Sequence, residues 1–172
     1  AIDSGTNPLR VLLYTMIPSF IIGFVQSVAL WVMQVYILNI EPVHPLTMFG
    51  VLVFVSWVFV AAILALNTAL GPAPGRLATM ALMSLQLVAS NGLYPPEVQP
   101  EFIQWVHSWD PMRYSVDLMR YALFDTATYD PRVWTAVTVL LAVGVGAVVI
   151  SCLALRARRV MQLRHLHPEL TV

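Results

Sequence analysis

The 172-residue sequence has no lysine and few charged residues of any kind. Charged residues make up 10% of the chain, and its nine basic residues, all arginines, are balanced by nine acidic ones. Soluble domains usually carry about 25% charged residues. With so little charge and 59% hydrophobic residues, this chain is expected to aggregate outside lipid. Its formal net charge of zero also excludes a basic surface for nucleic acid.

Cysteine is almost absent as well. Cys152 is the single cysteine and lies in an apolar run, which excludes a disulfide or a cysteine zinc site within one copy. The histidines do not form a metal site either, because His44 and His107 are isolated and His165 and His167 are not spaced for one helical face. We therefore predict no metal and no other cofactor.

Residues for catalysis are also lacking. The sequence has no glycine-rich phosphate loop, so any ATPase activity would belong to another chain. Glu101, Asp110 and Asp117 are carboxylates of the kind used in acid/base catalysis, but no nucleophile accompanies them, and hydrated surface carboxylates are the ordinary state. We therefore do not predict an enzyme.

Long apolar runs, by contrast, are present. The run over 133–155 carries no charge and is followed by Arg156, Arg158 and Arg159. About 20 apolar residues, at about 1.5 Å each, match a hydrocarbon core of about 30 Å. The run therefore predicts a membrane crossing, and the arginines mark its cytoplasmic end.

Four such crossings are predicted, over 11–40, 46–70, 77–93 and 133–155. The first is long enough that we expect it to tilt, to bend near Pro18 or Gly23, or to begin along the interface. The proline-rich and glycine-rich connections at 41–45 and 71–76 predict tight reversals. The predicted fold class is an all-α integral membrane protein with alternating crossings.

The arginines orient these crossings. Counting back from a cytoplasmic tail at 156–172 places 71–76 and the linker 1–10 inside, and 41–45 and 94–132 outside. Six arginines then lie inside and three outside, in the direction of the positive-inside rule. The inner six are Arg10, Arg76, Arg156, Arg158, Arg159 and Arg164, and the outer three are Arg113, Arg120 and Arg132.

Two short external helices are predicted in the outer loop, over 100–109 and 112–124. Gly92 and Pro95 are expected to end the third crossing, and Pro100 and Pro111 to begin the short helices. Each helix carries an apolar stripe expected to lie against, or dip into, the outer leaflet. The stripes are Phe102, Trp105, Val106 and Trp109, and then Val116, Met119, Ala122 and Leu123. Asp117 and Arg120 are spaced to pair.

The crossings contain polar residues but no charged ones. The polar residues are Gln26, Ser27, Gln34, Ser56, Asn67, Thr68, Gln86 and Ser151. They either form hydrogen bonds between helices or line a path, and the sequence leaves both open. Ion and proton routes normally need ionisable groups within the membrane, so an apolar or amphipathic cargo such as a lipid is favoured over an ion.

The chain begins without a methionine or a signal-peptide pattern. We therefore expect a piece of a longer protein, with one or more crossings preceding Ala1.

The outer loop resembles that of a known family. The run from Ser90 to Pro95, then Pro100 and Phe102, the cluster 110–114 and finally Arg120 are similar to the membrane subunits of type-two ABC exporters, and within them to the phage infection protein (YhgE/Pip) group. Arg113 and Asn91 depart from the family pattern, which has threonine and glycine there. The resemblance implies a six-helix permease fold of which this chain holds the last four crossings. The family-motif residues are Gly92, Pro95, Pro100, Trp105, Pro111, Tyr114 and Arg120.

The leading hypothesis is a permease-like domain of an export system in a bacterial plasma membrane. The resemblance implies membrane lipids as surroundings, a separate ATPase subunit as partner, and assembly as a homodimer or hetero-oligomer. The alternative is a non-transporting membrane anchor of the phage infection type, acting as a phage receptor or secretion accessory.

Overall fold

The structure is a computed structural model, and it describes residues 8–90, 101, 105, 110–124 and 131–164. Regular secondary structure in these ranges is helical, which confirms the all-α fold class. The elements are α1 (Pro8–Val32), the π-helix η1 (Met33–Ile37), α2 (Pro45–Leu70), α3 (Pro72–Ala89), α5 (Pro111–Phe124) and α6 (Pro131–Arg164). Each of these α-helices starts at a proline, whose fixed φ suits the first helical position and whose missing N–H would have no intrahelical partner there.

Three segments among the described residues are long and apolar enough to cross a membrane. They are Leu13–Ile37, Pro45–Leu70 and Pro131–Ala157, and they coincide with the first, second and fourth predicted crossings. The third prediction, over 77–93, corresponds to α3, which begins earlier, at Pro72, and is not among these segments. Its last residues lie outside the described ranges. The chain is an all-helical membrane protein.

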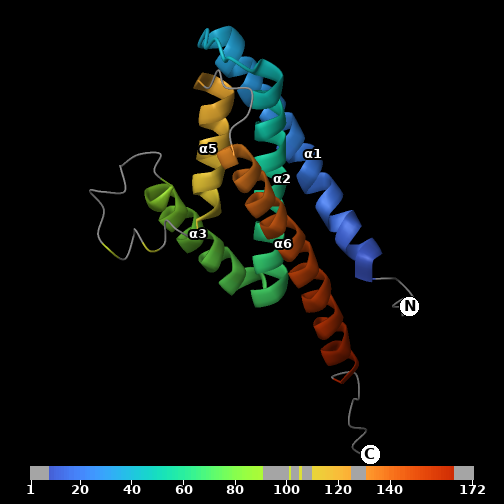
Figure 1. Cartoon of the computed structure of the whole chain (residues 1–172). Coiled ribbons are helices and arrows are strands. Elements are labelled where there is room, and N and C mark those ends of the chain that lie inside the picture. Colours follow the sequence, from blue (N-terminus) through green and yellow to red (C-terminus); the bar gives the residue numbers. More distant parts are fainter. Residues whose placement is uncertain (1–7, 91–100, 102–104, 106–109, 125–130, 165–172) are drawn as a thin grey trace, which may run out of the picture.

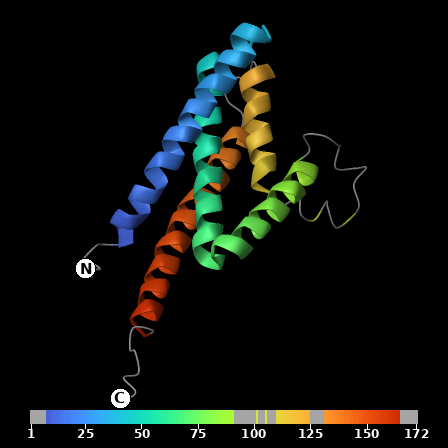
Figure 2. The ribbon, with the colours of Figure 1, turned by 180° about the vertical axis from the view of Figure 1, so that it is seen from behind.

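The long helices alternate in direction (Figure 1). The start of α1, the α2–α3 turn and the end of α6 lie toward one end of the molecule, and the α1–α2 connection and the end of α5 lie toward the other. Seen from behind, α1 and α5 flank α2 (Figure 2). This arrangement has the alternation that the connections predicted.

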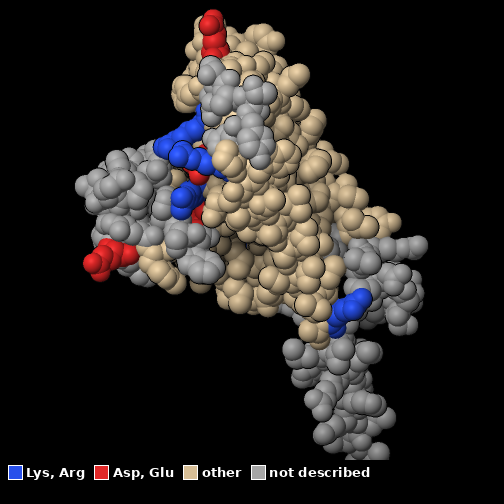
Figure 3. All heavy atoms as spheres, in the orientation of Figure 1, with Lys and Arg blue, Asp and Glu red and all other residues tan. Residues whose placement is uncertain are grey.

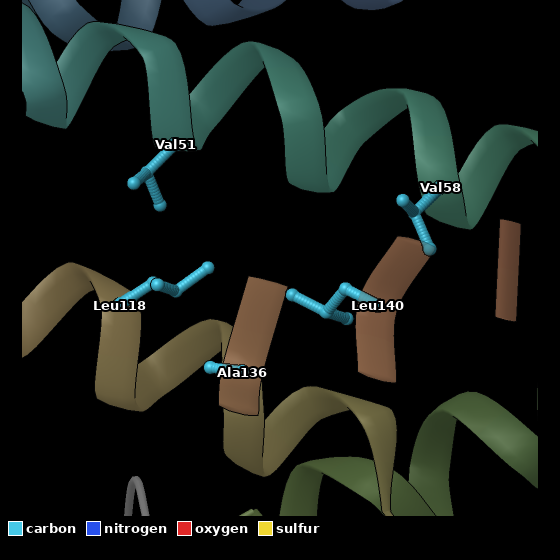
Figure 4. Packing of buried hydrophobic residues seen from close by; sticks show 5 residues of the cluster. All are labelled: Val51, Val58, Leu118, Ala136 and Leu140. Carbon is cyan, nitrogen blue, oxygen red and sulfur yellow. The ribbon is translucent and has the colours of Figure 1, made fainter. Parts of the chain in front are cut away.

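Helix α2 is the central element and contacts α1, α3, α5 and α6. One buried cluster joins α1, α2 and α6, and consists of Met16, Ala61, Ala65 and Ala147. A second cluster joins α2, α5 and α6, and consists of Val51, Val58, Leu118, Ala136 and Leu140 (Figure 4). Small alanine side chains let neighbouring helices approach closely, which is how helices associate when lipid is as apolar as the side chains.

The first crossing is continuous through Pro18 and Gly23, and its irregular part is the π-helix at its end. There the N–H of Leu38 donates to the carbonyl oxygen of Met33 at 2.9 Å, a bond that spans five residues. Asn39 follows with φ 50°, a left-handed conformation that asparagine tolerates. This long segment therefore ends in a π-helix, which is followed by a residue in the left-handed conformation.

The α2–α3 connection is a tight reversal that depends on two glycines. Gly71 has φ 101° and donates its N–H to the Asn67 carbonyl oxygen at 3.0 Å. A Cβ at Gly75 would lie 2.8 Å from the Asn67 Cα, so the start of α3 presses directly on the backbone of α2. No side chain larger than hydrogen fits there without a shift.

Candidate functional site

Helix α5 occupies a position that the sequence did not predict. The predicted external helix over 112–124 is present as α5, Pro111–Phe124, but it packs beside α2 and α6 within the bundle (Figure 1). Its inner face meets the second buried cluster, where Leu118 points toward Val51 of α2 (Figure 4). Neighbouring helices, and not headgroups alone, therefore hold α5.

The buried face of α5 is also turned relative to the predicted stripe. Ser115, Leu118 and Ala122 are buried, whereas Val116 and Met119 are half-buried. Apolar periodicity alone could not find this face, because it includes a serine. The Ser115 hydroxyl donates to the Pro111 carbonyl oxygen at 3.2 Å, so it can be buried without an unmet hydrogen bond.

The N-terminus of α5 is capped by a buried carboxylate. Asp110 is 2% exposed, and its Oδ1 accepts the backbone N–H of Met112 at 3.0 Å. Carboxylates are favoured at helix N-termini because the first N–H groups have no intrahelical acceptor and the helix dipole is positive there. Asp110 therefore has a structural function, which argues against the acid/base interpretation of this residue.

The opposite end of α5 is held by the α1–α2 connection. The backbone N–H groups of Val43 and His44 donate to the carbonyl oxygens of Leu123 and Ala122, at 3.3 and 3.0 Å. The His44 ring stacks on Tyr121, with centroids 5.5 Å apart and an interplanar angle of 23°. The two backbone bonds supply donors to carbonyl oxygens that have no intrahelical partner at a helix end. Together with the ring stacking, they connect α5 to the loop between α1 and α2.

Charged side chains gather on the outer flank of α5. Figure 3 shows basic and acidic side chains beside one another on this flank, while most of the described surface in that view carries no charge. The Arg113 guanidinium carbon lies 5.8 Å from the centroid of the Tyr114 ring, within reach of a cation–π contact. Arg120 is exposed, Asp117 is half-buried, and their pairing stays a prediction.

A pocket of about 350 Å³ lies between α1, α2 and α5. Its floor is α2, its walls are α1 and α5, and its lining carries no charged side chain. The lining residues are Gln26, Ser27, Leu30, Leu52, Val55, Ser56, Met112, Ser115, Val116 and Met119. This volume lies at the lower end of the range of small-molecule sites.

Four of the eight predicted polar residues bond to the backbone of their own helix. Asn67, Thr68 and Ser151 donate to carbonyl oxygens four residues earlier, at 2.9, 2.7 and 2.9 Å. Ser27 donates both to Gly23 of its own helix, at 2.8 Å, and to Leu52 of α2, at 3.2 Å. These bonds favour a structural function for these four residues over the lining of a polar path.

Two tryptophans form bonds between helices that the sequence analysis did not predict. The Trp31 Nε1–H donates to the Pro45 carbonyl oxygen at 3.0 Å, and the Trp57 Nε1–H donates to the Phe20 carbonyl oxygen at 3.3 Å. Only the amphipathic character of tryptophan could have suggested them, because an indole in lipid usually finds a hydrogen-bond acceptor.

The remaining predicted site residues are spread over the molecule. Gly92, Pro95 and Pro100 lie outside the described residues. Trp105 is 65% exposed, Pro111 begins α5, and Tyr114 packs at half-burial against the second buried cluster. Of the orienting arginines, Arg76 and Arg156 are exposed, and the side chains of Arg10, Arg158 and Arg159 lie outside the described part of the structure. Among the described residues no cluster of metal-ligating side chains is present.

Comparison with known proteins identifies the family. The family model described as ABC-2 type transporter matches residues 2–124, more than half of the chain. The chain belongs to the ABC-2 type transporter family. This match includes α1, α2, α3 and α5, so the ABC-2 region takes in the docked helix and its cap.

A curated relative confirms the resemblance to the YhgE/Pip group. The chain is 31% identical over 100 residues to the uncharacterized protein YhgE of Bacillus subtilis (strain 168), a stretch that covers 58% of this chain. The same stretch is 13% of the relative, so this ABC-2 chain matches a small part of a much longer protein. No solved structure matches the chain.

Proposed function

We propose that this chain is the permease-like membrane domain of an export system that moves a lipid-like or amphipathic molecule. The observation that carries the proposal is the ABC-2 match over residues 2–124. Members of this family work in the membrane with a separate ATPase. The sequence has no phosphate-binding loop, so energy from ATP would have to come from such a partner. On this proposal the chain lies in a bacterial plasma membrane, with its C-terminus in the cytoplasm, and works as an oligomer.

The chemistry of the spans supports the substrate class. The segments Leu13–Ile37 and Pro45–Leu70 contain no ionisable side chain other than Tyr14 and Tyr36, and their polar groups bond largely to backbone. The pocket between α1, α2 and α5 is uncharged as well. A small ion would find no charged ligand there to replace its water, whereas an apolar chain needs none.

A transport measurement tests the proposal. The full-length protein would be reconstituted in liposomes with the ATPase subunit encoded nearest to it, and a fluorescent phospholipid would be followed by chemical quenching from outside. We expect ATP-dependent movement of the lipid between leaflets, abolished by an ATPase variant that cannot hydrolyse ATP. Movement of a hydrophilic ion without movement of lipid would contradict the substrate class.

A non-transporting membrane anchor is the second candidate. It is favoured by the length of the relative, of which the chain matches 13%, because the remainder leaves room for a large additional domain. In the same liposomes this candidate predicts no ATP-dependent movement of any cargo.

A further inference from the structure

Two polar side chains in the middle of the membrane spans have no hydrogen-bond partner among the described residues. Gln26 lies near the centre of Leu13–Ile37 and Ser56 near the centre of Pro45–Leu70. Both line the uncharged pocket between α1, α2 and α5. Hydrocarbon offers no hydrogen-bond partner either, so polar groups at this depth are costly unless another molecule or another protein group meets them.

The packing of α1 against α2 explains why Ser56 has no partner. A serine hydroxyl within a helix usually donates to the carbonyl oxygen four residues earlier, which for Ser56 belongs to Leu52. That oxygen already accepts the Ser27 hydroxyl of α1 at 3.2 Å, and within α2 it also accepts a backbone N–H. A carbonyl oxygen has two lone pairs, so both are in use. The Ser56 hydroxyl is therefore available to a group in the pocket.

The rest of the pocket suits an apolar chain. Its other two polar side chains, Ser27 and Ser115, donate to backbone carbonyl oxygens. The apolar lining consists of Leu30, Leu52, Val55, Met112, Val116 and Met119. A mostly apolar lining with a few convergent polar groups is the usual form of a small-molecule site, and the volume of about 350 Å³ lies within the range of such sites.

The size and the surroundings of the pocket favour a lipid as its occupant. A helix with its side chains is about 10–12 Å across, so a neighbouring crossing cannot enter this space and could insert only single side chains. Gln26 and Leu30, on the α1 wall, are exposed, so the pocket is open to lipid chains on that side. A plain hydrocarbon chain would leave the amide and the hydroxyl without partners, whereas a lipid with an ester or a hydroxyl group would bond to them.

We propose that this pocket binds a lipid half-way across the membrane, with an ester or hydroxyl oxygen of the lipid bonded to Gln26 and Ser56. An apolar chain of the same lipid lies along the apolar lining. A lipid at rest keeps its oxygen groups at the membrane surface, so binding at the centre of the spans stabilises a lipid that is passing between leaflets. This inference rests on the proposed function, for which it names the binding site and the chemical groups that are bound.

Photolabelling of the full-length protein in liposomes tests the site. The probe is a diacylglycerol, which has two esters and a hydroxyl, with a photoactivatable group in one acyl chain. The control probe is an alkane that carries the same photoactivatable group and no oxygen. We expect the diacylglycerol to label residues that line the pocket, mapped by mass spectrometry, and the alkane to label them at least about threefold less. Competition by a long-chain alcohol or by a long-chain methyl ester distinguishes a bound hydroxyl from a bound ester, and competition by neither would contradict the proposal.

Substitutions of the two polar residues test their bonds. We expect the probe concentration for half-maximal labelling to rise about threefold for Gln26→Leu or Ser56→Ala, and about tenfold for the two together, the effects of one and two hydrogen bonds in a membrane. Gln26→Asn keeps a donor and an acceptor and should lose less than Gln26→Leu. The matched controls are Gln34→Leu in η1 and Ser19→Ala in α1, the same changes outside the pocket, for which we expect less than about a 1.5-fold change.

Other occupants of the pocket give different results, and each would overturn the proposal. Equal labelling by diacylglycerol and alkane, unchanged in the double variant, would show that plain lipid chains fill the pocket without recognition of an oxygen group. Labelling by neither probe would show that another part of the protein covers or fills it.

The outcomes separate this inference from the proposed function. ATP-dependent lipid movement by a protein whose pocket is not labelled would overturn the binding site and leave export intact. Labelling that depends on Gln26 and Ser56 in a protein that moves no lipid would support the binding site and contradict export.

Discussion

The packing of α5 into the bundle predicts the effect of shortening Leu118. This side chain is 2% exposed and lies in the cluster with Val51, Val58, Ala136 and Leu140. In a soluble core, Leu→Ala costs about 2–5 kcal/mol, of which roughly 2.4 kcal/mol is transfer of the lost groups, at about 0.8 kcal/mol each. Lipid is as apolar as leucine, so the transfer part largely vanishes in a membrane and the packing part remains. We expect Leu118→Ala to lower the free energy of unfolding by about 1–2 kcal/mol.

Because of a neighbouring pocket, we expect the loss of unfolding free energy for Leu118→Ala to lie toward the lower end of this range. Leu118 also lines an open apolar pocket of about 270 Å³ with Thr47, Gly50 and Phe54, so lipid chains can partly fill the space that the substitution creates. The measurement is reversible unfolding of the full-length protein in bicelles. The matched control is Leu153→Ala on α6, which is 58% exposed to lipid and should change stability by less than about 0.5 kcal/mol. Equal effects of the two variants would refute the docked position of α5.

Three further predictions follow from single contacts. Asp110→Ala removes the cap of α5 and should lower the free energy of unfolding by about 0.5–2 kcal/mol, while Asp110→Asn should lose less; thermal unfolding in detergent compares them. Gly75→Ala should be strongly destabilising because its Cβ would meet the Asn67 backbone, whereas Gly50→Ala, with nothing within 4 Å, should stabilise by up to about 1 kcal/mol in the same assay. Trp57→Phe keeps an aromatic ring but loses the bond to α1, and should cost about 0.6 kcal/mol, measured by unfolding in bicelles; an unchanged stability would remove this bond from the account.

Hydropathy identified the long helices because the thickness of the bilayer sets how long an apolar run must be to cross it, whatever the individual side chains are. The spans at Leu13–Ile37, Pro45–Leu70 and Pro131–Ala157 lie where apolar runs predicted them. Pro111 was equally informative about the start of α5, because proline is favoured at the first helical position, whereas the starts of α2, α3 and α6 at Pro45, Pro72 and Pro131 were not predicted.

The position of α5 could not be predicted from the same signals. A short amphipathic helix is compatible both with a membrane surface and with a groove between helices, and periodicity does not distinguish them. Tertiary contacts determine the position of α5. Leu118 packs against α2 and α6, the Ser115 hydroxyl donates to a backbone carbonyl oxygen of its own helix, and the backbone N–H groups of Val43 and His44 donate to carbonyl oxygens at the end of α5. Contacts between residues so far apart in the sequence produce no periodic pattern of apolar residues.

For the polar residues of the membrane spans, too, the sequence alone could not determine the role. The sequence identified Ser27 and Gln26 as polar positions and left open whether they bond between helices or line a path. The structure separates these neighbours, because a step of one residue turns a side chain by about 100° around the helix. Ser27 is buried and bonds to α2, while Gln26 is exposed and lines the pocket between α1, α2 and α5.

Topology mapping in intact cells tests the central claim, that the chain threads a membrane as a permease-like domain with its two ends on the same side. Single cysteines at Val43, in the α1–α2 connection, and at Ala73, in the α2–α3 reversal, would replace Cys152 as the only thiol. Both positions are exposed and lie at opposite ends of the molecule. The account predicts that a membrane-impermeant maleimide labels Val43→Cys from outside and Ala73→Cys only after the cells are permeabilised. Labelling of both positions from the same side would contradict it.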